Sequence, residues 1–346
     1  MAKKYNRKID IIIPAYNVED EILFRCLSSI ACQNAVKDLE VTIVDDASTV
    51  QNYQEVINNF SSILKINLLR YEENGGPGVA RQYGLDHTQN GYVTFIDADD
   101  TFNGAFALNY LKDSLESNPY YSVCIGGFDE VFTQEDDKGN QNVYFYPHDN
   151  DMVWMFGKLY RRNFIDKYNI RFHETSRANE DNGFNTTIRL LVNDYEQIAF
   201  IPNHVYYWHE NLNSITRKND YQYTYGDSKR DSFYGYVENM IFAIKQAKKA
   251  NPYSGEILKW TVSCMLNIYQ HYIECEKRAP DKLEKTLEYC KWYYQEAYSK
   301  IEDDISEEIL AVHYNDTMKN AYSLDSLNGI IPCMGIKEFI TMLKQD

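Results

Sequence analysis

The sequence has 346 residues, of which 44% are hydrophobic and 14% aromatic, and its formal net charge is −16. A chain of this length and composition can bury a sizeable core, which excludes wholesale disorder. The acidic balance argues against a general nucleic-acid binder, because such proteins present a basic face to the phosphate backbone.

Location is indicated by what the sequence lacks. No stretch approaches the ~20 apolar residues of a membrane span, and the first residues, MAKKYNRKIDIII, lack the apolar run and cleavage site of a signal peptide. The seven cysteines form no CxxC pair and no His-Cys zinc spacing, so we interpret them as reduced core thiols. These features predict a cytoplasmic protein without a transmembrane segment.

Four short, β-branched apolar runs begin the chain, and such runs are typical of strands buried on both faces of a parallel sheet. They lie at residues 8–14, 39–46, 64–71 and 91–98. Between the first two, Asn17 is expected to cap a helix whose apolar face is formed by Ile22, Leu23, Leu27 and Ile30. A second helix is predicted over residues 78–88. This alternation predicts a doubly wound α/β domain.

The pattern changes in the second part of the chain. Residues 133–142, TQEDDKGNQN, are predicted to form a surface hairpin or loop. Beyond residue 220, apolar residues at helical spacing predict successive amphipathic helices at 233–244, 258–273 and 283–294. We interpret them as a helical C-terminal appendage.

Polar residues follow three of the four predicted strands directly. The first, second and fourth runs end in PAYN, DDAS and DADD. In a doubly wound sheet the ligand lies beyond the carboxyl ends of the strands, so these three segments are expected to meet at one edge.

The segment YVTFIDADDTF places Asp97, Asp99 and Asp100 within four positions at a strand end. Carboxylates on such a turn are hard oxygen ligands that suit Mg²⁺ or Mn²⁺, with open positions that a diphosphate can fill. The alternative is solvated charge, with Asp100 capping the next segment. A D-x-D pattern alone does not decide between the two.

Two neighbouring segments favour a nucleotide ligand. VDDAS at 44–48 brings carboxylates that can accept hydrogen bonds from a base. NGGPGVARQYG at 74–84 is a glycine-rich turn before a helix, where backbone N–H groups can approach a ligand and Arg81 supplies a planar cation. This turn is neither a P-loop nor a G-x-G-x-x-G motif.

Taken in order and spacing, these motifs resemble the nucleotide-sugar half of the GT-A fold, and are most similar to the inverting glycosyltransferases of family 2. Further matches are GG at 126–127, GKLYRR at 157–162, ANEDNGF at 178–184 and YYWHENLNSIT at 206–216. The resemblance covers residues 8–220. It implies a mixed-sheet GT-A catalytic domain over 1–220, with a nucleotide-sugar half at 8–128 and an acceptor half at 129–220, followed by helices at 221–346. The GGPG turn also resembles phage-encoded members, which would act in the host cytoplasm.

The resemblance also implies donor-side roles for individual residues. The nucleoside pocket would be lined by Pro14, Tyr16 and Asn17, and the base, usually uracil, would be recognised by Asp45 or Asp46. Gly76 and Arg81 would lie near the diphosphate or ribose. The D-x-D motif would consist of Asp97, Ala98 and Asp99, with Asp99 holding Mn²⁺ or Mg²⁺. His209 is a second candidate ligand for the metal, although a packed surface histidine is the alternative.

On the acceptor side, an inverting transfer needs one carboxylate to accept the proton of the attacking hydroxyl. In the matched family position this base is Asp181, with Glu180 as orienting or acceptor-binding residue. The alternative is a pair of acidic residues at a helix N-terminus, where they offset the helix dipole. Lys158 and Ser214 are candidate contacts to the diphosphate or the acceptor, while a solvated basic strip would equally account for Lys158.

These features predict a metal-dependent glycosyltransferase that moves a sugar from a nucleotide sugar, with UDP-sugar as the leading donor, to a hydroxyl of a glycan or polyol-phosphate polymer. A modified base of phage DNA is an alternative acceptor. A catalytically silent sugar-nucleotide-binding scaffold is an alternative function, since fold alone does not establish activity. The C-terminal helices are a candidate homo-oligomer interface.

Overall fold

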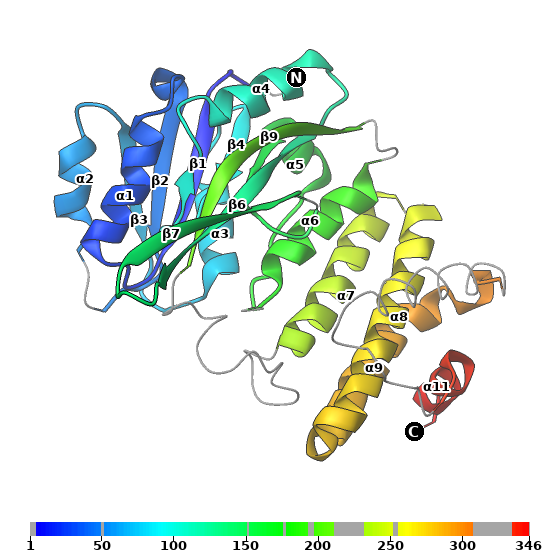
Figure 1. Cartoon of the computed structure of the whole chain (residues 1–346). Helices are drawn as coiled ribbons and strands as arrows, with labels where there is room; N and C mark the ends of the chain where they lie inside the picture. Colours follow the sequence, from blue (N-terminus) through cyan, green and yellow to red (C-terminus); the bar gives the residue numbers. More distant parts are fainter. Residues whose placement is uncertain are drawn as a thin grey trace. The chain divides into compact units, whose positions relative to one another are not determined.

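The computed structural model describes residues 5–49, 52–150, 152–175, 178–192, 197–210, 232–251, 255–306 and 334–345 (Figure 1). The described residues form two compact units. The first contains the described residues up to Thr175 together with those from Val192 to Glu210, and the second contains the described residues 178–191 and those from Ser232 onward.

The first unit is built on a mixed sheet whose strand order, within the described residues, is β3-β2-β1-β4-β8-β6-β9-β5, with β7 paired to β6. The strands are β1 (Ile9–Ala15), β2 (Leu39–Asp45), β3 (Lys65–Arg70), β4 (Tyr92–Phe95), β5 (Thr101–Phe102), β6 (Val123–Glu135), β7 (Gln141–His148), β8 (Lys158–Arg161) and β9 (Ile198–His209). The strands β3, β2, β1 and β4 run parallel, whereas β8 is antiparallel to both β4 and β6.

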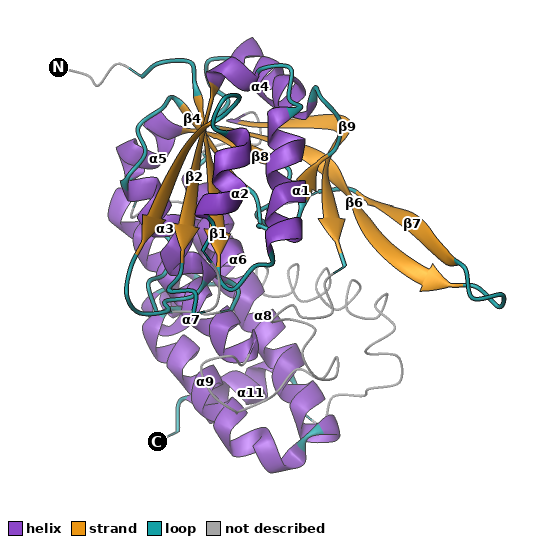
Figure 2. Cartoon of the chain, turned by 90° about the vertical axis from the view of Figure 1, so that its left-hand side faces the viewer, coloured by secondary structure: helices purple, strands orange, loops and turns teal. Residues whose placement is uncertain are grey.

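Helices cover both faces of β1, β2 and β4, because these strands are apolar on both sides. The expectation that the run at 64–71 is also buried on both faces is wrong, since β3 lies at the edge of the sheet and is mostly exposed. The helices of this unit are α1 (Asp20–Ala31), α2 (Gln54–Phe60), α3 (Pro77–Asp86), α4 (Ala107–Ser117) and α5 (Arg162–Tyr168). Figure 2 shows α1 and α2 on one side of β1, β2 and β4, with α3 and α5 on the other. The doubly wound α/β architecture is therefore confirmed.

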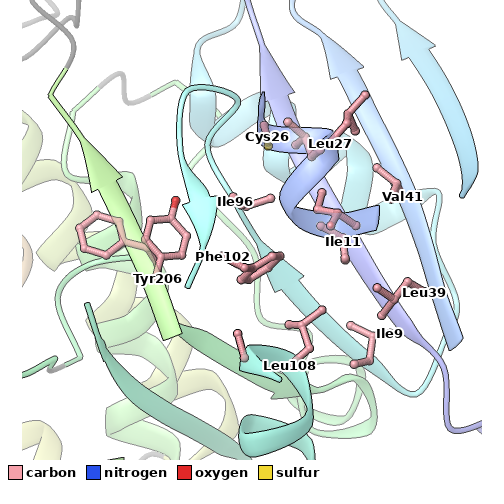
Figure 3. Packing of buried hydrophobic residues seen from close by; sticks show 14 of the residues in the cluster. Ile9, Ile11, Cys26, Leu27, Leu39, Val41, Ile96, Phe102, Leu108 and Tyr206 are labelled. Carbon is pink, nitrogen blue, oxygen red and sulfur yellow. The ribbon is translucent and has the colours of Figure 1, made fainter. Parts of the chain in front are cut away.

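The main core lies between the sheet and the side that carries α1, α2 and α4. Ile9 and Ile11 of β1 pack there against Leu27 of α1 and Leu108 of α4, and all four side chains are fully buried (Figure 3). The same cluster extends to Tyr206 of β9. A large apolar core of this kind holds the strand ends that carry the polar residues in place.

The second unit consists of helices only, within the described residues. They are α6 (Glu180–Leu191), α7 (Ser232–Ala250), α8 (Gly255–Arg278), α9 (Leu283–Glu296) and α11 (Ile336–Leu343). Helices α6 and α7 approach closely at Gly183, where an added Cβ would lie 2.5 Å from Oδ1 of Asn239. In the described part of the chain, no helix combines the length and the apolar character needed to cross a membrane.

Some of the elements predicted from the sequence are observed, and others differ from the prediction. The helices predicted beyond residue 220 correspond to α7, α8 and α9, and the expected hairpin at 133–142 is the β6–β7 turn. Helix α6 groups with the helical unit rather than with the sheet, and the expected boundary at 220 lies outside the described residues. Six cysteines lie in the described residues, and all six are free thiols.

The prediction that Asn17 caps α1 is wrong. The capping position belongs to Glu19, and Asn17 has a left-handed backbone with φ of 51°. Its side-chain oxygen instead accepts a hydrogen bond from the Thr49 N–H at 2.8 Å. Asparagine is among the few residues that tolerate this conformation, so it serves the turn rather than the helix.

Candidate active site

The ends of β1, β2 and β4 meet at one edge of the sheet, as the sequence predicts. Ala15 pairs with Asp45, and Ile12 pairs with Phe95, so the residues that follow these strands leave the sheet next to one another. The Asp46 N–H donates to the Ala15 carbonyl at 2.8 Å, which extends the ladder to the first polar residue. This edge collects the segments PAYN, DDAS and DADD.

The segment after β1 is tied to the segment after β2. The Asn17 N–H donates to Ser48 Oγ at 2.9 Å, and Ser48 Oγ shares a 2.9 Å hydrogen bond with the hydroxyl of Tyr53. Tyr16, which directly follows β1 at this edge of the sheet, is by contrast 47% exposed. An exposed aromatic ring beside a fixed loop suits a stacking contact with a nucleoside, as expected for Tyr16.

Asp45 is buried and holds the loop that follows β2. One carboxylate oxygen of Asp45 accepts the Ser48 N–H at 2.8 Å, and the other pairs with the guanidinium of Arg70. Arg70 also donates to the Ser48 carbonyl at 2.9 Å. In this structure Asp45 therefore organises its own loop, and its predicted contact with a base stays a prediction.

Asp46 is also buried and fastens the glycine-rich turn. Its carboxylate accepts hydrogen bonds from the N–H groups of Gly75 at 2.7 Å and Gly76 at 2.8 Å, and from the side-chain amide of Asn74 at 2.9 Å. Gly76 has φ of 89° and begins α3, a conformation that glycine adopts without a side-chain clash. The backbone donors expected to approach a ligand are thus bonded to Asp46.

The acidic turn after β4 forms an ion pair with the helix α3 that follows the glycine-rich turn. Arg81 of α3 donates to Asp97 Oδ1 at 2.6 Å, and the side chain of Arg81 is 5% exposed whereas that of Asp97 is 37% exposed. A buried guanidinium holds the carboxylate in one orientation and leaves part of it open to a ligand. The structure therefore brings the predicted residues Arg81 and Asp97 together.

Asp100 lies behind this turn and faces the protein interior. Its carboxylate accepts hydrogen bonds from the hydroxyl of Tyr206 at 2.7 Å and from the His209 N–H at 2.8 Å, and the residue is 1% exposed. Burial, followed by the negative charges of Asp99 and Asp97, raises the pKa of Asp100 well above its ordinary range, although both hydrogen bonds lower it.

Asp99 stands between these two carboxylates and is half-buried. Its backbone carbonyl accepts a 2.6 Å hydrogen bond from Arg25 of α1. No group of three or more His, Cys, Asp or Glu side chains within the described residues is arranged as a metal site. The donor set nevertheless fits a hard cation shared with a diphosphate, because Mg²⁺ is commonly held by one or two carboxylates with substrate phosphates.

Two of the predicted ligand contacts have other partners in this structure. His209 Nε2 lies 2.9 Å from Thr101 Oγ1, and burial, with a smaller contribution from Arg25, lowers the pKa of His209 to about 4. The ammonium of Lys158 is fully buried and donates to Asn150 Oδ1 at 2.8 Å, an arrangement that favours a structural role over a solvated strip. Ser214 lies outside the described residues.

Glu180 and Asp181 form the first turn of α6 in the helical unit. Glu180 is buried, whereas Asp181 is partly exposed and its Oδ1 accepts the N–H of Asn182 at 2.7 Å. This position agrees with acidic residues at a helix N-terminus, where they offset the helix dipole. The role of Asp181 as a base stays a prediction.

Sequence reasoning missed Tyr206, Arg25 and Arg70 as supports of this edge. Tyr206 lies in the segment YYWHENLNSIT that the sequence analysis singled out, but its bond to Asp100 spans 106 residues. Arg25 and Arg70 carried no motif at all. A position at the end of β3, directly paired with Asp45, is the signal that would have found Arg70.

Known proteins share both the motifs and the fold. Residues 10–178 match the family model of Glycosyl transferase family 2. Glycosyltransferase GlyA of Streptococcus pneumoniae is 27% identical over 240 residues, which are 61% of this chain and 32% of the relative. The poly(ribitol-phosphate) beta-glucosyltransferase of Bacillus spizizenii is 25% identical over 248 residues, which are 69% of this chain and 37% of the relative. The chain spans less than two thirds of the length of these relatives.

Among solved structures, TarS residues 1–349 of S. aureus in complex with UDP-GlcNAc matches with a TM-score of 0.66 and 17% identity, over 91% of this chain and 92% of that one. The fold and the converging strand ends thus define a GT-A domain. Residues 10–178 form a domain of the Glycosyl transferase family 2 type.

Proposed function

We propose that this protein is a metal-dependent inverting glycosyltransferase that moves a sugar from a UDP-sugar to a hydroxyl of a glycan or polyol-phosphate polymer. The acidic turn beyond β4 carries the proposal, because Arg81 fixes Asp97 there while Asp99 occupies the same turn. The relatives that act on poly(ribitol phosphate), and the similar fold of TarS in complex with UDP-GlcNAc, support the choice of donor and acceptor.

On the donor side, each carboxylate of the turn has a distinct task. Asp97, held by Arg81, accepts a hydrogen bond from a hydroxyl of the ribose or the sugar. Asp99 would hold the cation that the diphosphate of the donor requires. Bound Mn²⁺ or Mg²⁺ supplies Lewis-acid stabilisation of the negative charge that develops on the leaving nucleotide. Asp100 and Tyr206 keep the turn in place from behind.

On the acceptor side, Asp181 accepts the proton of the attacking hydroxyl. The acceptor oxygen forms a bond to the anomeric carbon as the bond from that carbon to the phosphate oxygen breaks, and the electron pair leaves with the nucleoside diphosphate. Attack from the face opposite the leaving group inverts the configuration. An ordinary carboxylate is a weak base, so positioning of the hydroxyl provides most of its effect.

The test is nucleotide release from UDP-, GDP-, TDP- and CDP-sugars, with Mn²⁺ and then with EDTA. We expect release from the UDP-sugars that stops with EDTA and falls by about 100-fold or more in Asp99→Asn. Asp181→Asn is expected to lower transfer to an acceptor by a factor of about 10²–10⁴ without loss of donor affinity. Asp113→Asn, which changes an exposed carboxylate on α4, is the matched control.

Either of two results would contradict the proposal. Absence of both release and donor binding across the panel would favour the scaffold function. Loss of donor binding in Asp181→Asn would remove this residue from the base role.

A further inference from the structure

The chain enters helix α6 through a turn with a left-handed residue. Asn179, which directly precedes Glu180 and Asp181, has φ of 60°, a conformation that few residues other than glycine adopt. Its carbonyl accepts the N–H of Gly183 at 3.0 Å and so closes the first turn of the helix. The position of both predicted acceptor-side carboxylates therefore depends on this turn.

The side-chain amide of Asn239 in α7 fixes this turn. Its Nδ2 donates to the carbonyl of Ala178, the residue before Asn179, at 2.9 Å, and to the Gly235 carbonyl of α7 itself at 2.9 Å. Asn239 is fully buried, and Figure 1 shows α6 and α7 side by side. One amide group thus joins the entry of α6 to the backbone of α7.

Two glycines bring the same two segments close together. A Cβ added to Gly235 would lie 2.5 Å from the carbonyl oxygen of Ala178 and 2.9 Å from its Cβ. A Cβ added to Gly183 of α6 would lie 2.9 Å from the Cβ of Asn239. Because folded proteins do not hold a Cβ this close to another heavy atom, a larger residue at either position would displace the turn or separate the helices.

The packing of two helices does not by itself account for Asn239. Asparagine is a poor helix former, and a buried amide lowers stability unless its hydrogen bonds are made. An apolar side chain would fill the same space without this requirement. The amide adds a directional bond to one carbonyl, and such a bond fixes a position more narrowly than apolar contact does. The carbonyl that it selects lies two residues before α6 begins.

We propose that Asn239 is a positioning residue for the transfer reaction, and that it holds the turn before α6 so that Asp181 meets the attacking hydroxyl in a productive orientation. The inference rests on the proposed function, since it concerns the base of the same reaction. It gives the helical unit a part in the chemistry, because α7 lies outside the residues 10–178 that match the family model. A base works only within hydrogen-bond reach of the proton, and a displacement of about 1 Å can lower a rate by about 10²-fold.

Two substitutions in α7 disturb the turn without changing Asp181. Asn239→Ala removes the hydrogen bond to Ala178 and keeps the Cβ that packs near Gly183. Gly235→Ala instead places a methyl group against the Ala178 carbonyl.

The matched controls lie in α8 of the same helical unit. Asn267→Ala removes an amide that donates to the hydroxyl of Tyr236 at 3.2 Å. Gly255→Ala adds a methyl group at a position where no atom of the described residues lies within 4 Å. We expect neither control to change the rate of transfer. Melting temperatures show that each variant is folded.

The first measurement is the rate of UDP release from UDP-glucose and UDP-GlcNAc with Mn²⁺, with poly(ribitol phosphate) as acceptor and with water alone. We expect Asn239→Ala and Gly235→Ala to lower the rate by about 10- to 100-fold at an unchanged dissociation constant for the UDP-sugar. In the Asp181→Asn background both substitutions should change the rate by less than about twofold, because a residue that acts through the base has no further effect once the base is lost. A general loss of folded protein would lower both backgrounds equally.

The second measurement is hydrogen exchange, which needs no turnover. Loss of a hydrogen bond that contributes about 1 kcal/mol should speed exchange of the amides at 178–184 by about fivefold in Asn239→Ala. Gly235→Ala should act in the same direction. Exchange in α8 should stay unchanged in both variants, and both controls should leave residues 178–184 as they are.

Any of three results would overturn the proposal: equal loss of rate in both backgrounds, undiminished transfer by Asn239→Ala, or unchanged exchange at 178–184 in this variant. These failures leave the proposed function intact. Absence of release by the unaltered protein, or full activity of Asp181→Asn alone, would contradict the proposed function itself and the positioning role with it.

Discussion

Replacing Tyr206 by Phe tests how the buried carboxylate behind the acidic turn is supported. The hydroxyl of Tyr206 donates to Asp100 Oδ2 at 2.7 Å and accepts the Asp97 N–H at 3.3 Å, and the ring is fully buried. Phe keeps the ring contacts, so no cavity forms. A hydrogen bond to a charged group contributes about 1.5–3 kcal/mol, and a neutral one about 0.5–1.5 kcal/mol. We therefore expect a loss of about 2–4.5 kcal/mol in the free energy of unfolding at a pH where Asp100 is ionised.

Tyr53→Phe is the matched control for this measurement. The hydroxyl of Tyr53 accepts the Val18 N–H at 3.1 Å and also forms a hydrogen bond with the hydroxyl of Ser48. Unlike Asp100, the side chain of Ser48 is uncharged. We expect a loss of about 1 kcal/mol that does not change with pH.

The hydrogen bond from Tyr206 lowers the pKa of Asp100, so its loss should matter most where the carboxylate is ionised. In urea unfolding followed by tryptophan fluorescence, at two pH values on either side of the titration of Asp100, the Tyr206→Phe penalty should be smaller at the lower pH. Equal penalties for the two variants at both pH values would refute the charge-assisted bond.

Two further predictions concern the same edge of the sheet. Because burial raises the pKa of Asp100, the stability linked to this group is fully present below its ordinary value of 3.8 and is lost as pH rises through the raised pKa. The Asp100→Asn variant should therefore have a higher melting temperature than the unaltered protein at neutral pH in EDTA. This difference should vanish at acidic pH. A lower melting temperature of the variant at neutral pH would contradict the prediction. Gly76→Ala places a Cβ on a residue with φ of 89° and should cost about 1–3 kcal/mol in urea unfolding, whereas a neutral effect would show that the turn can adopt another conformation.

The sheet was predictable because its strands have a strong local signal. The expected strand at 8–14 is observed as Ile9–Ala15, and the one at 64–71 as Lys65–Arg70. β1 is buried on both sides and leaves a continuous apolar run, whereas β3 is mostly exposed and was identified by its β-branched and apolar residues alone. The carboxyl ends of parallel strands lie at the same edge of the sheet. The convergence of the donor-side motifs follows from topology alone.

The partners of individual side chains were not predictable in the same way. No pattern indicated that Asp46, which with Asp45 was a candidate for the base contact, bonds to a turn about 30 residues later. Nor did any pattern indicate that Lys158, a candidate contact to the diphosphate or acceptor, is fully buried. The partner of a side chain depends on which remote segments of the chain lie close to it in the fold, and no local sequence pattern encodes this. The sequence of β7 also gave no clear signal of which face is exposed, because large apolar or aromatic residues occupy both of its faces.

The bonds from Asp46 to Gly75 and Gly76 have a consequence for the thermodynamics of donor binding. A glycine-rich turn is ordinarily the segment that loses the most backbone freedom when a ligand arrives. Here a carboxylate of the same chain already accepts hydrogen bonds from both amides, which restricts the backbone of the turn in the folded chain. If the proposed donor binds at this turn, part of the entropy cost of ordering the turn is therefore met during folding and not on binding.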